Sequence, residues 1–173
     1  TDVNCQILFY SAPDGNCKIR RFVLYPIFIH PIIRVMKLPK TIQLDISDTQ
    51  VFDLAAAPGE WAVTGSFCFS DTDPEQLSRK QRFAFQSGWM GLESGGYSTF
   101  VQVTTATDDE FEGVVMALAD MFVADFGAPD RAAAMPMARD EVRYVADLCE
   151  FDDGTLLSLT REQDTGGIRE VVR

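Results

Sequence analysis

The chain has 173 residues, of which 46% are hydrophobic and 24% charged, and its formal net charge is −11. This length and composition are typical of one globular domain whose core is large enough to fold without a metal or a disulfide. The negative charge argues against general binding to nucleic acids or to anionic membrane surfaces, because both present phosphates. A basic partner protein or a cation is compatible with it.

The composition of the chain changes at Met36. Residues 1–35 hold four of the 15 basic residues but only two of the 26 acidic ones, so their formal charge is +2 and that of residues 36–173 is −13. The early segment also lacks a regular hydrophobic period. We therefore predict that Met36 is the natural start of a single domain and that residues 1–35 are an upstream extension. The alternative is an added hairpin, with strands at residues 7–10 and 19–25 around a turn at residues 13–15.

The first predicted elements after Met36 are strands. Apolar Ile42, Leu44 and Ile46 alternate with polar residues, which predicts a strand over residues 41–46 and a short second one at 51–52. After a turn at residues 57–59, a longer strand is expected.

That longer strand covers residues 61–69. It carries large apolar side chains on one face and small ones on the other. A helix is expected next, from Asp73 as N-cap to about residue 87, with Leu77, Ala84 and Phe85 facing the core.

The second half of the chain is more regular. Residues 97–105 are rich in β-branched and aromatic residues and predict a strand. Thr107 and Glu110 form a capping box before a helix with one apolar stripe, made of Phe111, Val115, Leu118 and Phe122. A further helix is expected from about Ala132 or Pro136 to Cys149, with Ala138, Val142, Val145 and Cys149 on one face. A strand at residues 155–160, a hairpin turn at 164–167 and a strand at 168–172 complete the chain.

This order predicts an α+β fold. Strand pairs at both ends of the domain favour antiparallel pairing, and helices in the middle favour a helical layer on the sheet. We expect a mostly antiparallel sheet of about five strands with two to three helices packed on one face.

The residues of catalytic and metal sites are scarce. The single histidine, His30, precedes Met36, so a domain starting there has no histidine for a catalytic triad or a metal site. The cysteines show no metal-binding spacing, and no cofactor is expected. Cys68 and Cys149 are interpreted as small buried residues. We therefore expect no catalytic residue and lean against an enzyme.

Four carboxylates lie around the first predicted turn and are the weak candidates for acid–base or cation chemistry. In most proteins such residues are solvated turn carboxylates, and that interpretation stays open beside the functional one. They are Asp45, Asp48, Asp53 and Glu60.

A glycine-bearing loop at residues 88–96 contains unusually many large apolar residues. It follows a helix and opens a strand, which is the wrong order for a phosphate-binding loop. Its apolar residues indicate either a plug in the core or the wall of an interaction surface. The residues of this possible surface are Trp89, Met90, Leu92 and Tyr97.

The sequence also favours a cytoplasmic location. The longest apolar run, residues 22–33, contains Pro26, His30 and Pro31 and is too short to span a bilayer. No secretory signal pattern begins the chain.

Residues 37–52, 57–67 and 98–101 resemble an uncharacterised family of short alphaproteobacterial proteins. The resemblance covers about residues 36–173, and the segment before Met36 has no counterpart in it. It assigns no reaction and therefore no catalytic residue. It implies a helper role beside larger bacterial enzymes.

These observations lead to one main hypothesis and one alternative. We expect a non-catalytic cytoplasmic protein that binds a protein partner or associates with itself, as an accessory or assembly factor. The alternative is a small-molecule-binding domain or an enzyme that works through carboxylates such as Asp45 and Asp53.

Overall fold

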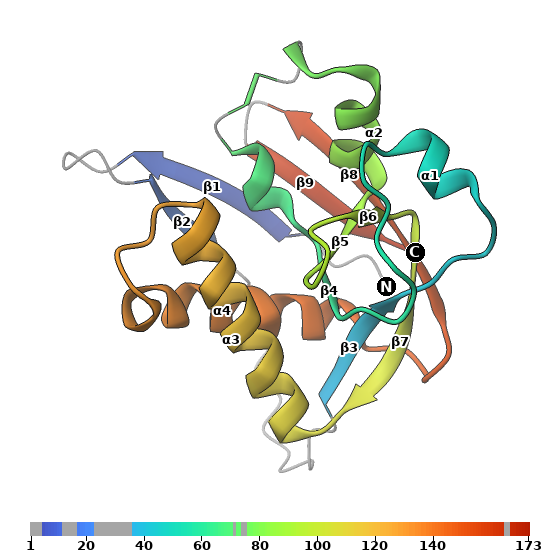
Figure 1. Ribbon diagram of the computed structural model, residues 1–173. Coiled ribbons are helices and arrows are strands. Elements are labelled where there is room, and N and C mark those ends of the chain that lie inside the picture. Colours follow the sequence, from blue (N-terminus) through green and yellow to red (C-terminus); the bar gives the residue numbers. More distant parts are fainter. Residues whose placement is uncertain (1–4, 12–16, 23–35, 71, 74–75, 165–166) are drawn as a thin grey trace.

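The fold combines strands and helices in a mixed α+β arrangement (Figure 1). The computed structural model describes residues 5–11, 17–22, 36–70, 72–73, 76–164 and 167–173. Of residues 5–11 and 17–22 it describes the backbone.

The larger sheet has six strands in the order β2-β1-β9-β8-β7-β3, and every neighbouring pair is antiparallel. Strand β8 joins its two halves, because residues 156–158 pair with β7 and residues 159–164 pair with β9. The strands are β1 (Cys5–Ser11), β2 (Cys17–Phe22), β3 (Met36–Thr41), β7 (Phe100–Ala106), β8 (Leu156–Asp164) and β9 (Gly167–Val172).

A second, three-stranded antiparallel sheet has the order β4-β5-β6. It is joined to the larger sheet by a bridge between Lys40 and Trp61. Its strands are β4 (Ala62–Val63), β5 (Trp89–Gly91) and β6 (Tyr97–Ser98).

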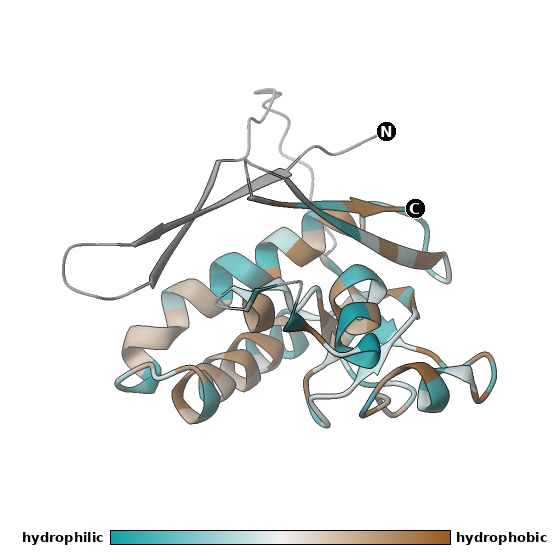
Figure 2. Ribbon diagram, turned by 90° about the horizontal axis from the view of Figure 1, so that it is seen from above, coloured by the Kyte–Doolittle hydropathy of each residue, from teal (hydrophilic) through white to brown (hydrophobic). Residues whose placement is uncertain are grey.

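Two long helices, α3 (Asp108–Asp125) and α4 (Arg131–Leu148), form an antiparallel pair on one side of the strands, and α2 (Arg79–Ser87) packs against β8 (Figures 1 and 2). Helix α3 begins at the predicted capping box, in which Thr107 and Glu110 bond each other's backbone N–H groups. Helix α4 begins at Asp130, whose side chain accepts a hydrogen bond from the Ala133 N–H. Figure 1 also labels the short helix α1 (Ser47–Val51).

The core lies between these helices and the two sheets. The predicted stripe on α3 (Phe111, Val115, Leu118, Phe122) and that on α4 (Ala138, Val142, Val145, then Cys149) are all buried. Phe67 packs edge-on against Phe122, with ring centroids 5.0 Å apart. The apolar periods of both helices therefore indicated the buried faces correctly.

The prediction of a strand at residues 41–46 was wrong. The strand lies earlier, as β3, and its ladder ends at Thr41. Leu44 and Ile46 are 65% and 66% exposed, and residues 51–52 end α1 rather than forming a strand. Alternation alone did not locate the strand because the alternating residues here meet solvent.

Of the strand predicted over residues 61–69, only the two residues of β4 belong to a strand in the structure. The chain leaves the strand at Gly65, which has a φ of +71° and begins a 3-10 helix at Ser66–Phe69. A Cβ on Gly65 would lie 2.9 Å from the Met90 Cβ, so glycine fits both the backbone angle and the close packing.

The helix expected from Asp73 starts later, at Arg79. Ser78 is its N-cap and forms a capping box with Gln81. Asp73 accepts hydrogen bonds from Gln76 in a separate turn. The inward positions Leu77, Ala84 and Phe85 were correct, since all three are buried.

The expected single sheet is also corrected, because the strands form two sheets. The mixed α+β class, the antiparallel pairing, the helix pair and the C-terminal hairpin of β8 and β9 are confirmed. The backbone of residues 5–11 and 17–22 pairs as two antiparallel strands, which overlap those of the alternative hairpin, and β1 also pairs with β9. The turn expected at residues 13–15 and the end of the second expected strand at residues 23–25 lie outside the described residues.

Candidate functional site

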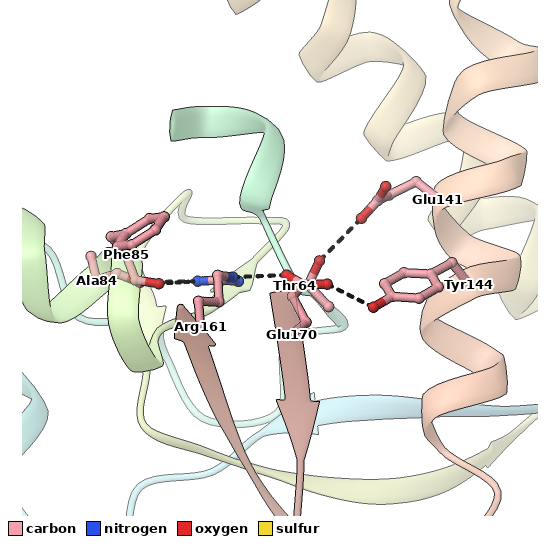
Figure 3. Close-up of polar contacts among 7 residues, drawn as sticks. All are labelled: Thr64, Ala84, Phe85, Glu141, Tyr144, Arg161 and Glu170. Carbon is pink, nitrogen blue, oxygen red and sulfur yellow. Dashed lines mark hydrogen bonds and ion pairs between the residues drawn. The ribbon is translucent and has the colours of Figure 1, made fainter. Parts of the chain in front are cut away.

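A buried ion pair lies at the centre of the polar contacts inside the protein (Figure 3). Arg161 of β8 and Glu170 of β9 are direct partners in the strand register, and their Nε and Oε1 atoms are 2.8 Å apart. Both side chains have no exposed surface. The Tyr144 hydroxyl of α4 donates to the other Glu170 oxygen at 2.8 Å.

The guanidinium of Arg161 also binds the end of α2. Its Nη1 donates to the carbonyl oxygens of Phe85 at 2.7 Å and Ala84 at 3.2 Å, where the helix dipole is negative. The pair therefore connects α2 and α4 to the β8–β9 hairpin. Its role in the described contacts is structural. Both charged groups are buried, and both carboxylate oxygens of Glu170 accept hydrogen bonds from neighbouring side chains.

The two cysteines whose side chains are described, Cys68 and Cys149, are weak nucleophiles. Burial raises the pKa of the Cys68 thiol to about 11 and that of Cys149 to about 12. Burial and the neighbouring Cys68 also raise the pKa of Tyr97. Since the thiolate is the reactive form, neither cysteine is activated at neutral pH.

Two of the four candidate carboxylates fix loops. Glu60 is buried and accepts hydrogen bonds from the backbone N–H groups of Ala57, Glu93 and Ser94 at 2.6–3.1 Å. Asp48 is buried and accepts from the Thr99 hydroxyl at 2.6 Å and from the Thr99 N–H at 3.2 Å.

The other two carboxylates, Asp45 and Asp53, are exposed. The Asp45 side chain accepts a hydrogen bond from the Ser47 N–H at 2.7 Å. Hydrogen bonding to the Ser47 side chain, and then to its N–H, lowers the pKa of Asp45. Among the described residues, no three His, Cys, Asp or Glu side chains gather as a metal site would require. The four carboxylates are therefore not gathered into a group of three or more.

The apolar residues predicted as a possible interaction surface lie in or against the core. Trp89 is 0% and Met90 is 3% exposed, and Leu92 and Tyr97 are partly buried against the same cluster. These side chains therefore pack in the core or against it. The alternative weighed for them, a plug in the core, fits this arrangement.

The exposed apolar residues that stand out belong instead to residues 42–54, here called the anchored loop. The Ile42 N–H donates to the Phe100 carbonyl at 3.4 Å, and the Tyr97 N–H donates to the Leu54 carbonyl at 2.8 Å. The two ends of the loop are therefore bonded to Phe100 and Tyr97, which are three residues apart in the sequence. Compact loops with close ends are frequently functional.

Some side chains of the anchored loop face inward and hold it in place, whereas others are apolar and face solvent. Phe52 is 1% exposed and its ring lies 5.9 Å from that of Tyr97, while Asp48 bonds to Thr99. Three aliphatic side chains of the loop nevertheless face solvent: Leu44 (65% exposed), Ile46 (66%) and Leu54 (53%).

The alternation of Ile42, Leu44 and Ile46 predicted a strand, but these residues lie in the anchored loop, where Leu44 and Ile46 are exposed. A signal for exposure was present in Asp45, Ser47 and Asp48, which favour a turn and a helix start over a continuing strand.

None of the helices formed by the described residues has both the length and the hydrophobicity needed to span a bilayer. A family model described as a family of unknown function, DUF6505, matches residues 36–173. The chain belongs to this family. No curated protein and no solved structure matches the chain.

The DUF6505 match confirms the resemblance seen in the sequence to an uncharacterised family. It begins at Met36, the residue at which the charge of the chain changes. Within the family region lie the buried ion pair, both loop-fixing carboxylates and the whole anchored loop. The anchored loop is the candidate site that we carry forward.

Proposed function

We propose that this DUF6505 protein is a non-catalytic accessory factor that docks on a partner protein through its anchored loop. The observation that carries the proposal is the exposure of Leu44, Ile46 and Leu54, each more than half exposed, on a loop fixed at both ends. Three exposed aliphatic residues within one short loop make that loop a candidate interaction site. A loop already held in place also loses little conformational freedom on binding.

The charge around these aliphatic residues favours a partner of different sequence. Asp45 and Asp53 are exposed beside them, and the whole chain carries −11. Two copies meeting through this loop would bring like charges together. A partner with an apolar patch rimmed by lysine or arginine would complement both the aliphatic and the acidic residues.

A carboxylate-based enzyme is the weaker candidate and is not proposed. Asp48 and Glu60 are both buried and accept hydrogen bonds from backbone N–H groups of other segments. These contacts account for the presence of both residues without a reaction.

The test is a quantitative affinity purification from the native host with the full chain as bait. The test bait carries L44S, I46S and L54S. The matched control bait carries M116S, M137S and L156S, which remove three apolar residues of 42–45% exposure elsewhere on the surface. We expect one protein to be retained by the unchanged and control baits and lost from the test bait.

The retained protein is then purified and titrated by calorimetry. We expect 1:1 binding that weakens at least ~100-fold in the test variant, equivalent to about 2.7 kcal/mol. Equal loss in the control variant, or no protein that distinguishes the baits, would refute docking through the anchored loop. A dimer of the unchanged chain that the test variant abolishes would assign the loop to self-association instead.

A further inference from the structure

We propose that a groove between α3, α4 and the start of β3 binds a lysine- or arginine-bearing peptide segment of a partner protein. The groove has a volume of about 870 Å³, within the range of ligand sites. None of its lining residues belongs to the anchored loop, so this inference stands independently of the proposed docking there.

The groove is long enough for several residues of a peptide. Its α4 wall runs from Arg139 to Asp147, which spans about 12 Å at 1.5 Å per residue. That length matches about four residues of extended chain at ~3.3 Å each. The facing wall is formed by Asp108 and Glu112 in the first turns of α3.

Apolar side chains contribute to the lining between these walls. Phe111 and Cys149 are buried, whereas Phe151 is 42% exposed and offers its ring to a ligand. The methylene stem of a lysine or arginine packs well on such a surface while its charged head reaches the walls. A cation above the ring of Phe151 would gain a further electrostatic attraction.

The charges of the lining select a cation. All three basic groups already face carboxylates: Arg139 bonds both oxygens of Glu112, and Lys37 lies 3.5 Å from Asp153. Arg143, whose side chain is 63% exposed, lies 3.8 Å from Asp140. Five carboxylates against three cations give the lining a formal charge of −2; the carboxylates are Asp108, Glu112, Asp147, Glu150 and Asp152.

The groove therefore combines what a basic peptide needs: length, an apolar surface for the stems and carboxylates for the heads. The ion pair of Arg139 and Glu112 also joins α4 to α3 across the groove. Because these two walls are connected before binding, the ligand need not order them.

The test measures fluorescence anisotropy of a labelled hexapeptide of alternating arginine and alanine, with the full chain, at 150 mM salt. A glutamate–alanine hexapeptide serves as the negative probe. The test variant is D108N with D152N, both exposed groove positions. The matched control, D125N with E93Q, makes the same change in net charge at exposed positions outside both the groove and the anchored loop.

We expect saturable binding of the arginine peptide only, weakened at least ~10-fold by the test variant and less than ~2-fold by the control. R143Q removes a cation from the groove wall and should tighten binding about threefold. A folding defect would weaken binding, so this variant distinguishes binding in the groove from an effect of misfolding. Equal weakening by both variants would overturn the proposal in favour of the general negative field.

Two further outcomes would also overturn the peptide assignment. Binding of spermidine in calorimetry without binding of the peptide would assign the groove to a small amine. A dimer in light scattering that the test variant abolishes would assign it to a second copy of the chain.

Discussion

Arg161 and Glu170 face each other across the β8–β9 hairpin as a fully enclosed ion pair. The Nη2 atom of Arg161 has no hydrogen-bond partner, although Nε and Nη1 are both bonded. In the described contacts, Glu170 is the carboxylate that bonds this guanidinium. Removing either partner leaves a charge buried without compensation.

The first prediction concerns E170Q. It should lower the free energy of unfolding by roughly 3–5 kcal/mol in urea titrations, because Arg161 stays buried without its counter-ion. Replacing both residues, as R161M with E170L, should cost less than E170Q alone. D140N with R143Q, at an exposed contact of 3.8 Å, should change stability by less than ~0.5 kcal/mol. A loss below ~1 kcal/mol for E170Q would contradict the structural role assigned to the pair.

The second prediction concerns thiol chemistry. Because burial raises the pKa of Cys68 to about 11 and of Cys149 to about 12, iodoacetamide at pH 8.5 should leave both unmodified in the native protein. Both should react once guanidinium chloride unfolds the chain, and peptide mass spectrometry would measure each site. Native alkylation of Cys149 at the rate of an unfolded thiol would contradict its burial.

The same shifts set a direction for stability at alkaline pH. The unfolded thiols ionise near their usual pKa of 9.0, whereas the folded ones stay protonated to about 11 and 12. The native state thus binds more protons in that window, and its stability should fall as pH rises above about 9. C149A should lessen this fall in urea titrations at pH 8 and pH 10.

The third prediction concerns the capping box of α3. Hydrogen bonds from the Thr107 backbone N–H and hydroxyl, both at 2.9 Å, hold the pKa of Glu110 below its usual 4.5. The stability from this carboxylate is present above the unfolded pKa and is lost as pH falls through the folded one. T107V should raise the pKa of Glu110 in an NMR titration.

A reciprocal control is available at Asp153, whose pKa is lowered chiefly by the Thr105 hydroxyl at 2.7 Å. T105V should raise the pKa of Asp153 and leave that of Glu110 unchanged. A Glu110 pKa that does not respond to T107V would mean that the capping box is not formed in solution.

The fourth prediction concerns the domain boundary. A chain of residues 36–173 should fold alone, because it spans the family match and the described hydrophobic core lies within it. We expect one cooperative thermal transition with a midpoint within about 5 °C of that of the full chain. N-terminal mass spectrometry on protein from the native host should find Met36 at the start.

Two results would contradict that boundary. One is a truncated chain that aggregates or melts without cooperativity, which would make the β1–β2 hairpin part of the fold through its pairing with β9. The other is an intact N-terminus upstream of Met36 in the native protein.

The helices of the second half could be predicted because their signals are local. Thr107 and Glu110 mark where α3 begins, and Phe111 to Phe122 repeat at the helical period. The strands of the first half could not be predicted in this way. The chain leaves the course of β4 at Gly65, where a Cβ would lie too close to Met90, a residue distant in sequence. Whether an alternating residue such as Leu44 is buried depends on where the rest of the chain lies.

The buried ion pair was missed although the sequence held a signal for it. The predicted turn at residues 164–167 pairs Asp164 with Gly167, and counting outward from it places Arg161 opposite Glu170. Opposite charges in register on a hairpin are a recognisable pair. Their burial was not predictable, because it requires α2 and α4 to cover that face of β8 and β9.

The carboxylate of Glu60 also constrains how this family can vary. A Cβ added to Gly91 would lie 2.5 Å from the Glu60 Oε2 and 3.0 Å from the Ala56 Cβ. A side chain at position 91 therefore requires the Glu60 carboxylate to move or a shorter residue to replace Glu60, and either change would release the backbone N–H groups of Glu93 and Ser94. Relatives should thus change positions 60 and 91 together, so that an alignment would show them as a covarying pair.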